Sequence, residues 1–376
     1  MEQIKGILYT EQFRFEPGIL TIEKDRIQAV ELCPMEDLSK EEQETYLLPG
    51  LIDIHFHGCA GYDFCDGTKE ACEAIASYEL QHGITTICPA TMTLSEEQLM
   101  KICHTASGVQ LESLKGIYLE GPFVSYEKRG AQNADYIRKP DMALLDNFQK
   151  ISGGLIKIVA IAPEEEGAME CISESSERFR FSIAHTCADY ETALRAIESG
   201  AKQITHLYNA MPPFSHREPG VIGAAAENDE IVVELICDGV HVHPSVVRST
   251  FKLFGADRII LISDSMMATG MKDGIYALGG QKVEVKGNLA LLEDGTIAGS
   301  VTNLYDCMRK AIEMGVAKED VIRATTINPA KAIGISADYG SLEVGKRADI
   351  LVTDRDFCLK KIIKYGRVEK SSFAFL

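Results

Sequence analysis

The chain has 376 residues, of which 45% are hydrophobic and 25% charged, as is typical of a globular protein with one large domain and a smaller one. Its formal net charge of −18 argues against nucleic acid or an acidic membrane surface as a general partner. The N-terminal segment has no apolar core of signal-peptide length, and no later stretch is long and apolar enough to span a bilayer. We therefore expect a cytoplasmic protein without a membrane or nucleic-acid partner.

Short alternating strands such as 18–30 are indicated in the first 49 residues. From residue 51 the pattern changes to apolar strands of four to eight residues, most of them followed by a helical stretch such as 69–82, 95–106 or 190–199. The predicted strands are 51–55, 84–90, 116–119, 156–161, 181–184, 203–205, 232–236 and 259–262. Eight strands separated by crossovers predict a parallel (β/α)8 TIM-like barrel over residues 50–339, in the α/β class.

A hairpin is predicted after the eighth strand, at 281–297, with turns at Gly287-Asn288 and Asp294-Gly295. Helices at 302–314 and 318–332 follow, and the tail from residue 340 returns to strands at 347–353 and 362–364. Neither end of the chain has enough apolar residues to fold alone. We therefore expect residues 1–49 and 340–376 to pair into a small β-sandwich domain.

Polar side chains gather where the predicted strands end. Barrel enzymes carry their catalytic side chains at these carboxyl ends, because the loops there surround one common mouth. The residues at or just beyond the strand ends are Asp53, His55, His57, Glu120, His185, His206, Asn209, Asp238, His241 and Asp264. Five of the nine histidines are among them, which predicts a single site at the barrel mouth.

The histidine spacing points to a metal. His55 and His57 are two residues apart on an extended strand, so both imidazoles point to the same side. Together with Glu120, His185 and His206 they form a ligand set suited to Zn²⁺ or a similar divalent ion. A lone histidine at a strand end is as often bonded to a loop carbonyl as to a metal, but four around one mouth favour a metal site.

Several motifs resemble known sequences over essentially the whole chain. LPGLIDIHFHG (48–58) and GSLEVGKRADILVTD (340–354) resemble segments of the amidohydrolase superfamily. GIYLEGPF (116–123), IAHT (183–186), THLYNAMPPFSHREPG (205–220), DGVHV (238–242) and ISDSM (262–266) resemble the family of N-acetylglucosamine-6-phosphate deacetylases. This resemblance implies metal-dependent removal of the acetyl group from N-acetyl-D-glucosamine 6-phosphate, in amino-sugar catabolism.

The resemblance also assigns roles to residues. It implies that Glu120, His185 and His206 hold the principal metal. His55 and His57 match members with a second ion, so one ion or two, of Zn, Fe, Mn or Co, remain open. Asp264 matches the catalytic aspartate. Positions that match substrate contacts are Ala131, Gln132, Asn209, Ala210, Arg217, Asp238, His241, Ile297, Ala298, Gly299 and Ser300.

The resemblance also implies how the phosphate group and the acetyl group of the substrate are bound. The arginine that matches Arg217 reaches the neighbouring subunit's site, which implies a homodimer. Gln132 stands where the family usually has a histidine that meets the acetyl carbonyl, and glutamine cannot become a cation. Either the second metal compensates for this change, which is our hypothesis, or the substrate differs.

Three alternatives remain open from the sequence. The first is a deacetylase for the galactosamine epimer, and discrimination between the two sugars depends on one hydroxyl group. Another amidohydrolase would be expected to carry a metal-bridging lysine at strand 4, which we do not find. A non-catalytic sugar-phosphate binder would be expected to lack Asp264 or some of the metal ligands, and all are present.

Overall fold

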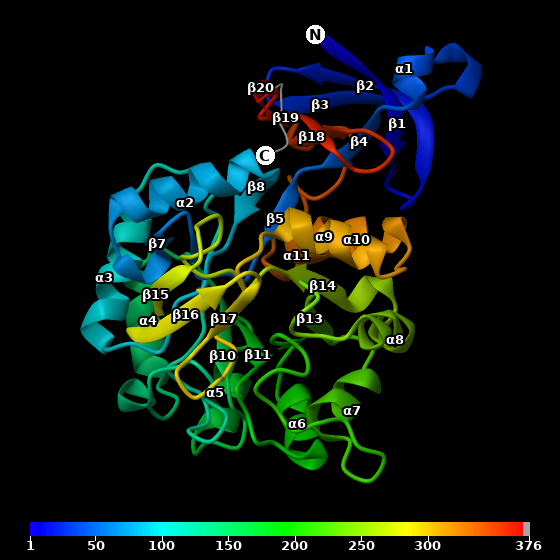
Figure 1. Cartoon of the computed structure of the whole chain (residues 1–376). Helices are drawn as coiled ribbons and strands as arrows, with labels where there is room; N and C mark the ends of the chain where they lie inside the picture. Colours follow the sequence, from blue (N-terminus) through cyan, green and yellow to red (C-terminus); the bar gives the residue numbers. More distant parts are fainter. Residues whose placement is uncertain (371–376) are drawn as a thin grey trace.

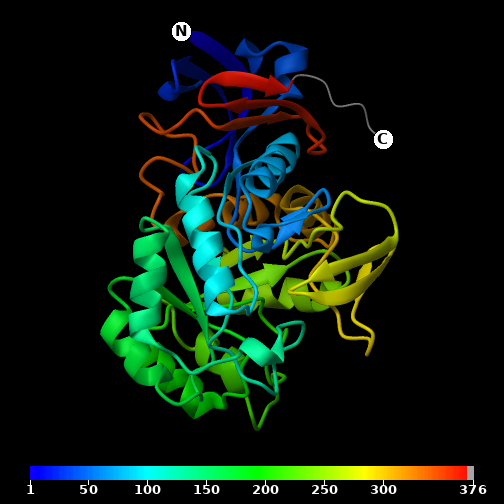
Figure 2. The same cartoon turned by 90° about the vertical axis from the view of Figure 1, so that its left-hand side faces the viewer.

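The computed structural model describes residues 1–370 and divides them between one separate sheet and one larger body (Figure 1). The separate sheet contains both ends of the described chain, and the larger body contains a curled parallel sheet surrounded by helices (Figure 2). Within residues 1–370 no helix is both long and apolar enough to cross a bilayer.

The two ends of the chain pair as expected. Seven strands follow the order β20-β19-β18-β4-β1-β2-β3, and β18 lies antiparallel to β4 with Val352 opposite Leu47. The strands are β1 (Glu2–Tyr9), β2 (Phe15–Glu23), β3 (Arg26–Leu32), β4 (Tyr46–Pro49), β18 (Ile350–Thr353), β19 (Leu359–Lys364) and β20 (Arg367–Lys370). Because β4 pairs with both β1 and β18, hydrogen bonds join all seven strands in one sheet, whereas we expected the two facing sheets of a sandwich.

All eight strands expected in the larger body are present and run parallel. They are β5 (Leu51–Asp53), β8 (Ile84–Ile87), β9 (Ile117–Leu119), β10 (Ile156–Ile161), β11 (Arg180–Ile183), β12 (Gln203–Ile204), β13 (Val232–Ile236) and β14 (Ile259–Ile262). β9 to β14 form a six-stranded sheet in chain order, and β5 pairs with β8. A bridge between Ala90 and Tyr118 links the two sheets, and the Asp264 amide donates to the His55 carbonyl at 3.0 Å on the other side.

Helices cover the outside of this curled sheet, as the long apolar strands require. They are α2 (Lys69–Gln81), α3 (Glu96–Gly108), α4 (Met142–Ile151), α5 (Ala168–Ser175), α6 (Tyr190–Glu198), α7 (Gly220–Ala226), α8 (Pro244–Phe254) and α9 (Leu304–Glu313). Side chains fix several of their starts: Ser95 forms a capping box with Gln98 at α3, and Asp189 accepts from the Thr192 amide at α6. Short elements outside this layer are α1 (Lys40–Gln43), β6 (Gly58–Cys59) and β7 (Tyr62–Asp63).

Two predictions beyond the eighth strand need correction. The helix expected at 318–332 is two helices, α10 (Lys318–Thr325) and α11 (Ile327–Ala332), because the Pro329 ring cannot continue a helix past the Thr325 carbonyl. The expected hairpin is present as β16 (Gln281–Lys286) and β17 (Leu289–Leu291), but β15 (Gly274–Leu278) extends it to a three-stranded sheet. The turn at Gly279-Gly280, where both residues have positive φ, was missed, whereas the Gly287-Asn288 turn is confirmed.

Glu79 on α2 provides a test of the packing beneath the site. It is fully buried, and neither carboxylate oxygen has a hydrogen bond of ordinary geometry within residues 1–370. Burial, with the nearby charge of Asp53, raises the pKa of Glu79 to about 8. Between pH 4.5, the pKa of this group in the unfolded chain, and about pH 8, the folded chain keeps the Glu79 carboxyl protonated whereas the unfolded chain does not. The contribution of Glu79 to the free energy of unfolding therefore falls as pH rises through this range.

We expect Glu79→Gln to remove this pH dependence. The variant should gain stability relative to the parent as pH rises from 5 to 8, by at most about 1.4 kcal/mol per pH unit. Urea unfolding at several pH values measures the difference. Glu73→Gln, at an exposed position of the same helix, is the matched control and should leave the slope unchanged. Equal pH slopes for Glu79→Gln and the parent would contradict the prediction.

Candidate metal centre and active site

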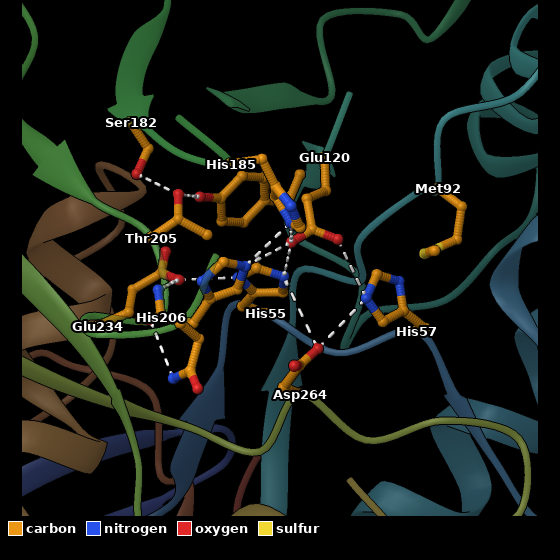
Figure 3. Close-up of polar contacts among 12 residues, drawn as sticks. His55, His57, Met92, Glu120, Ser182, His185, Thr205, His206, Glu234 and Asp264 are labelled. Atoms are coloured by element: carbon orange, nitrogen blue, oxygen red, sulfur yellow. Dashed lines mark hydrogen bonds and ion pairs between the residues drawn. The ribbon is translucent and has the colours of Figure 1, made fainter. Parts of the chain in front are cut away.

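The predicted ligands meet at one end of the curled sheet, each just beyond the end of its strand (Figure 3). His55 and His57 follow β5, Glu120 follows β9, His185 follows β11, His206 follows β12 and Asp264 follows β14. His185, His206 and Asp264 have φ values of 43°, 27° and 48°. Positive φ strains residues that carry a side chain, and such strain concentrates at functional sites.

Glu120 lies at the centre of the cluster. Its Oε1 is 3.2 Å from His185 Nε2, 3.0 Å from His206 Nε2 and 3.2 Å from His55 Nε2. All four side chains are buried. Glu120, His185 and His206 form one group whose ligand atoms lie within 4.8 Å of one another. This group is the predicted principal metal site.

The second group uses the same carboxylate. Glu120, His55 and His57 also bring their ligand atoms within 4.8 Å of one another, and Glu120 Oε2 is 3.2 Å from His57 Nε2. Asp264 Oδ1 lies on the other side of this group, 3.2 Å from His57 Nε2 and 4.0 Å from His55 Nε2 (Figure 3). One carboxylate therefore faces two sets of ligands, with the predicted catalytic aspartate beside them.

The electrostatics of the cluster fit a cation. Burial opposes protonation of His55, but the carboxylates of Glu234 and Glu120 outweigh it and raise the pKa of His55 well above its usual value. Burial likewise opposes protonation of His57, yet hydrogen bonds to Asp264 and Glu120 raise its pKa to about 10. His55 Nε2, although fully buried, has no hydrogen-bond partner among the described residues. Such a site attracts positive charge, and nitrogen and carboxylate ligands suit a divalent metal.

Two of the histidines are oriented by acceptors that the sequence analysis did not identify. His55 Nδ1 is 2.7 Å from Glu234 Oε2, and His185 Nδ1 is 2.9 Å from the Lys128 carbonyl oxygen. Such acceptors fix which ring nitrogen remains free for a metal. Glu234 was missed because it lies inside a predicted apolar strand; a single charge in the run IVVELIC was the available signal.

Gln132 is engaged within the protein. Its Nε2 donates to Glu120 Oε2 at 2.8 Å, and its Oε1 accepts from the Thr93 amide at 2.6 Å. Gln132 is 2% exposed, so its amide is held firmly against the carboxylate. The donor that we considered for the acetyl oxygen is therefore bonded to the carboxylate at the centre of the cluster.

A pocket of about 470 Å³ opens over the cluster. Its lining includes most of the predicted site residues, namely His57, Glu120, Ala131, Gln132, His185, His206, Asn209, Ala210, His241, Asp264, Ile297 and Gly299. It also includes residues that the sequence analysis did not single out: Met92, Glu127, Lys128, Arg129, Gly130, Leu278, Asp294 and Thr296. The basic pair Lys128 and Arg129 lies in the segment KRGAQN (128–133), from which only Ala131 and Gln132 were predicted as site residues.

Four predicted substrate residues do not line this pocket. Asp238 lies beside it, where its carboxylate accepts from His241 Nδ1 at 2.7 Å. Ala298 is fully buried, and the Ser300 hydroxyl donates to the Ser263 carbonyl at 2.6 Å. Arg217 is exposed in the loop before α7. Within one chain the geometry therefore gives Asp238 an orienting contact with His241 and leaves Arg217 away from the pocket.

Comparisons with known proteins place these features in a family. Residues 46–369 match the amidohydrolase family. The chain belongs to the amidohydrolase family. It is 40% identical to an N-acetylglucosamine-6-phosphate deacetylase from Bacillus subtilis, over 94% of this chain and 93% of that protein. It is 32% identical to an N-acetylgalactosamine-6-phosphate deacetylase from Escherichia coli O157:H7, over 96% of this chain and 97% of that protein.

A solved structure gives a similar result. A mutant N-acetyl-D-glucosamine-6-phosphate deacetylase from Mycobacterium smegmatis, in complex with N-acetyl-D-glucosamine 6-phosphate, superposes with a TM-score of 0.91. The two chains are 31% identical, and the match covers 97% of this chain and 98% of that one. The resemblance stated from the sequence motifs is therefore confirmed, and the protein is an amidohydrolase enzyme.

The raised pKa values predict that metal binding releases protons. At neutral pH the metal-free chain holds protons on both His55 and His57, and metal ligands must be deprotonated. An ion entering this group should displace about two protons, so its affinity should fall as pH is lowered. Calorimetric titration with Zn²⁺ in buffers of different ionisation enthalpy measures the release. Binding without proton release would contradict the prediction.

Proposed function

We propose that the protein hydrolyses the acetamide of N-acetyl-D-glucosamine 6-phosphate to D-glucosamine 6-phosphate and acetate, using one or two divalent ions. The observation that carries the proposal is the Glu120 carboxylate shared by two ligand groups with Asp264 beside them. The similarity to the Bacillus subtilis and Mycobacterium smegmatis deacetylases supports this substrate. An amide is a poor electrophile, so its hydrolysis needs a strong nucleophile and a protonated leaving group.

The metal ligands and Asp264 serve different parts of this reaction: the ligands would hold the ion, and Asp264 would transfer the proton. A divalent ion, when bound, supplies hydroxide near neutral pH and polarises a carbonyl group. Burial would raise the pKa of Asp264, but its hydrogen bond to His57 and the nearby His55 hold it below the usual value. Asp264 is therefore a carboxylate at neutral pH, able to accept a proton from the attacking water and deliver it to the departing amine.

Pocket residues would bind the sugar phosphate. Asn209, Ala210 and His241 line the pocket, and hydrogen bonding to Asp238 outweighs burial and raises the pKa of His241. This favours the cationic imidazole that a phosphate prefers. Arg217 is exposed and outside the pocket of its own chain. We assign it to the pocket of a second subunit in a homodimer, where its fork of donors would bind the phosphate.

The ligand set does not identify the metal, because zinc, iron, manganese and cobalt all suit histidine and carboxylate. The His55 and His57 pair supports two ions. We also infer a closed (β/α)8 barrel over residues 50–339, a small domain from 1–49 and 340–376, and a cytoplasmic location; residues 371–376 of that domain lie outside the described part of the chain. The continuous parallel links from β5 round to β14 support the barrel.

The galactosamine epimer is the second candidate substrate. The observation in its favour is the Escherichia coli relative named for that sugar. The alternative of an amidohydrolase with a strand-4 lysine has less support, since Ala162 and Pro163 follow β10.

Release of acetate after metal loading tests the proposal. N-acetyl-D-glucosamine 6-phosphate should be hydrolysed in preference to its galactosamine epimer and to the unphosphorylated sugar. Asp264→Asn should lower kcat by about 10²–10⁴-fold, because general acid–base catalysis is lost, while the protein still binds metal. Activity on the epimer alone would overturn the substrate assignment, and full activity of Asp264→Asn would overturn the role of Asp264.

Mixing of two impaired variants, assayed at a substrate concentration below the KM of the Arg217→Ala variant, tests the shared site. Arg217→Ala should raise KM for the phosphorylated substrate by about 10–100-fold, because a charge-assisted hydrogen bond is lost. When Arg217→Ala and Asp264→Asn chains are refolded together, mixed dimers should regain one intact site and recover activity. If Arg217 acts within its own chain, the mixture should show no gain over the separate variants.

A further inference from the structure

A row of polar side chains, half-buried at Arg180 and fully buried beyond it, crosses three neighbouring strands and ends at His55. Arg180 begins β11, Gln203 begins β12 and Glu234 lies within β13. Arg180 Nε donates to Gln203 Oε1 at 2.7 Å, Gln203 Nε2 donates to Glu234 Oε1 at 2.5 Å, and His55 Nδ1 lies 2.7 Å from Glu234 Oε2. Gln203 and Glu234 are both fully buried. The proposed chemistry assigns no role to this row.

The direction of each hydrogen bond in the row is fixed by arginine. A guanidinium can only donate, so Gln203 must turn its oxygen to Arg180 and its nitrogen to Glu234. Glu234 Oε1 therefore accepts from Gln203, and Oε2 also accepts from the His206 backbone amide at 3.1 Å. Both oxygens face donors, so only a carboxylate satisfies residue 234. A glutamine there would place one N–H group against another.

This carboxylate fixes the state of His55. An ionised carboxylate accepts but does not donate, so His55 Nδ1 carries the hydrogen. Once an incoming ion displaces the proton on Nε2, the lone pair of Nε2 points away from Glu234, and Nε2 lies 3.2 Å from Glu120 Oε1. Figure 3 shows Glu234 on the opposite side of the His55 ring from Glu120. His55 is thus held ready to bind an ion on the side of Glu120.

The support is specific to one of the two ligand groups. In the group of Glu120, His185 and His206, the His185 ring is held by a backbone carbonyl, and His206 Nδ1 has no partner among residues 1–370. Glu234 meets His206 only through the backbone amide. A carboxylate behind a ligating imidazole fixes the ring and raises its basicity.

We propose that Glu234, held in place by Arg180 and Gln203, is the positioning residue that gives the group of His55, His57 and Glu120 its affinity for a divalent ion. It therefore decides whether the chain holds one ion or two. This inference rests on the metal-dependent function proposed above.

The first test is metal content at graded free Zn²⁺, measured by mass spectrometry on the full chain. The parent should hold two ions. Glu234→Gln should keep the ion of His185 and His206 and bind the other about 10–100-fold more weakly. With Mn²⁺, electron paramagnetic resonance should show a coupled pair in the parent and an isolated ion in the variant, a difference that general loss of stability does not produce.

A double variant separates positioning from loss of folding. In the double variant Gln203→Glu with Glu234→Gln, every hydrogen-bond donor of the row again faces an acceptor. Residue 203 then accepts from both Arg180 and residue 234. The double variant keeps the net charge, so it should fold like the parent and recover most of the affinity for the second ion. Glu79→Gln, the same substitution at another fully buried glutamate, is the matched control and should hold two ions.

The outcomes distinguish this inference from the proposed function. If the parent holds two ions and Glu234→Gln holds both with unchanged affinity, the role of Glu234 is overturned while the proposed function stands. A folded double variant that binds the second ion as weakly as Glu234→Gln would overturn the inference that the hydrogen bonds from Arg180 through residue 203 hold residue 234 in place. A parent that holds fewer than two ions would overturn this inference together with the two-ion form of the proposed function.

Discussion

The arrangement of the site depends on the attraction between the Glu120 carboxylate and four histidine rings. These side chains follow β5, β9, β11 and β12, which are not all neighbours, so the site forms only when the curled sheet brings the carboxyl ends of these strands together. Removal of so many charged groups from water is costly unless each has a partner. A cation bound between the rings and the carboxylates of Glu120 and Asp264 would replace the protons that the histidines otherwise retain.

A second layer of contacts keeps the ligands in place. Glu234 and the Lys128 carbonyl each contact the ring nitrogen of a histidine that faces away from Glu120, and Gln132 donates to Glu120 Oε2. Two of these contacts come from the 128–132 loop, which the Gln281 amide of β16 also holds through the Ala131 carbonyl. The metal ligands, the pocket wall and the three-stranded sheet β15–β17 are therefore mechanically connected. Substitutions in that loop are expected to affect metal binding as well as substrate binding.

The strands and the convergence of the candidate ligands could be predicted from the sequence, because both have local signals. Apolar runs such as IKIVAI identify buried parallel strands, and His55-x-His57 puts two rings on one side. The joining of the chain ends in one sheet, in place of two facing sheets, could not be predicted, because it depends on β4 pairing with both β1 and β18. The partners of Glu234 and Gln132 were equally inaccessible, since they lie far away in sequence and leave no periodic pattern.

The central claim is that one carboxylate is shared by two metal sites. Anomalous diffraction at the zinc edge from Zn²⁺-loaded crystals tests it most directly. The account predicts two peaks that flank Glu120, one beside His185 and His206 and the other beside His55 and His57. A single peak at saturating Zn²⁺, or two peaks that do not both contact Glu120, would contradict it.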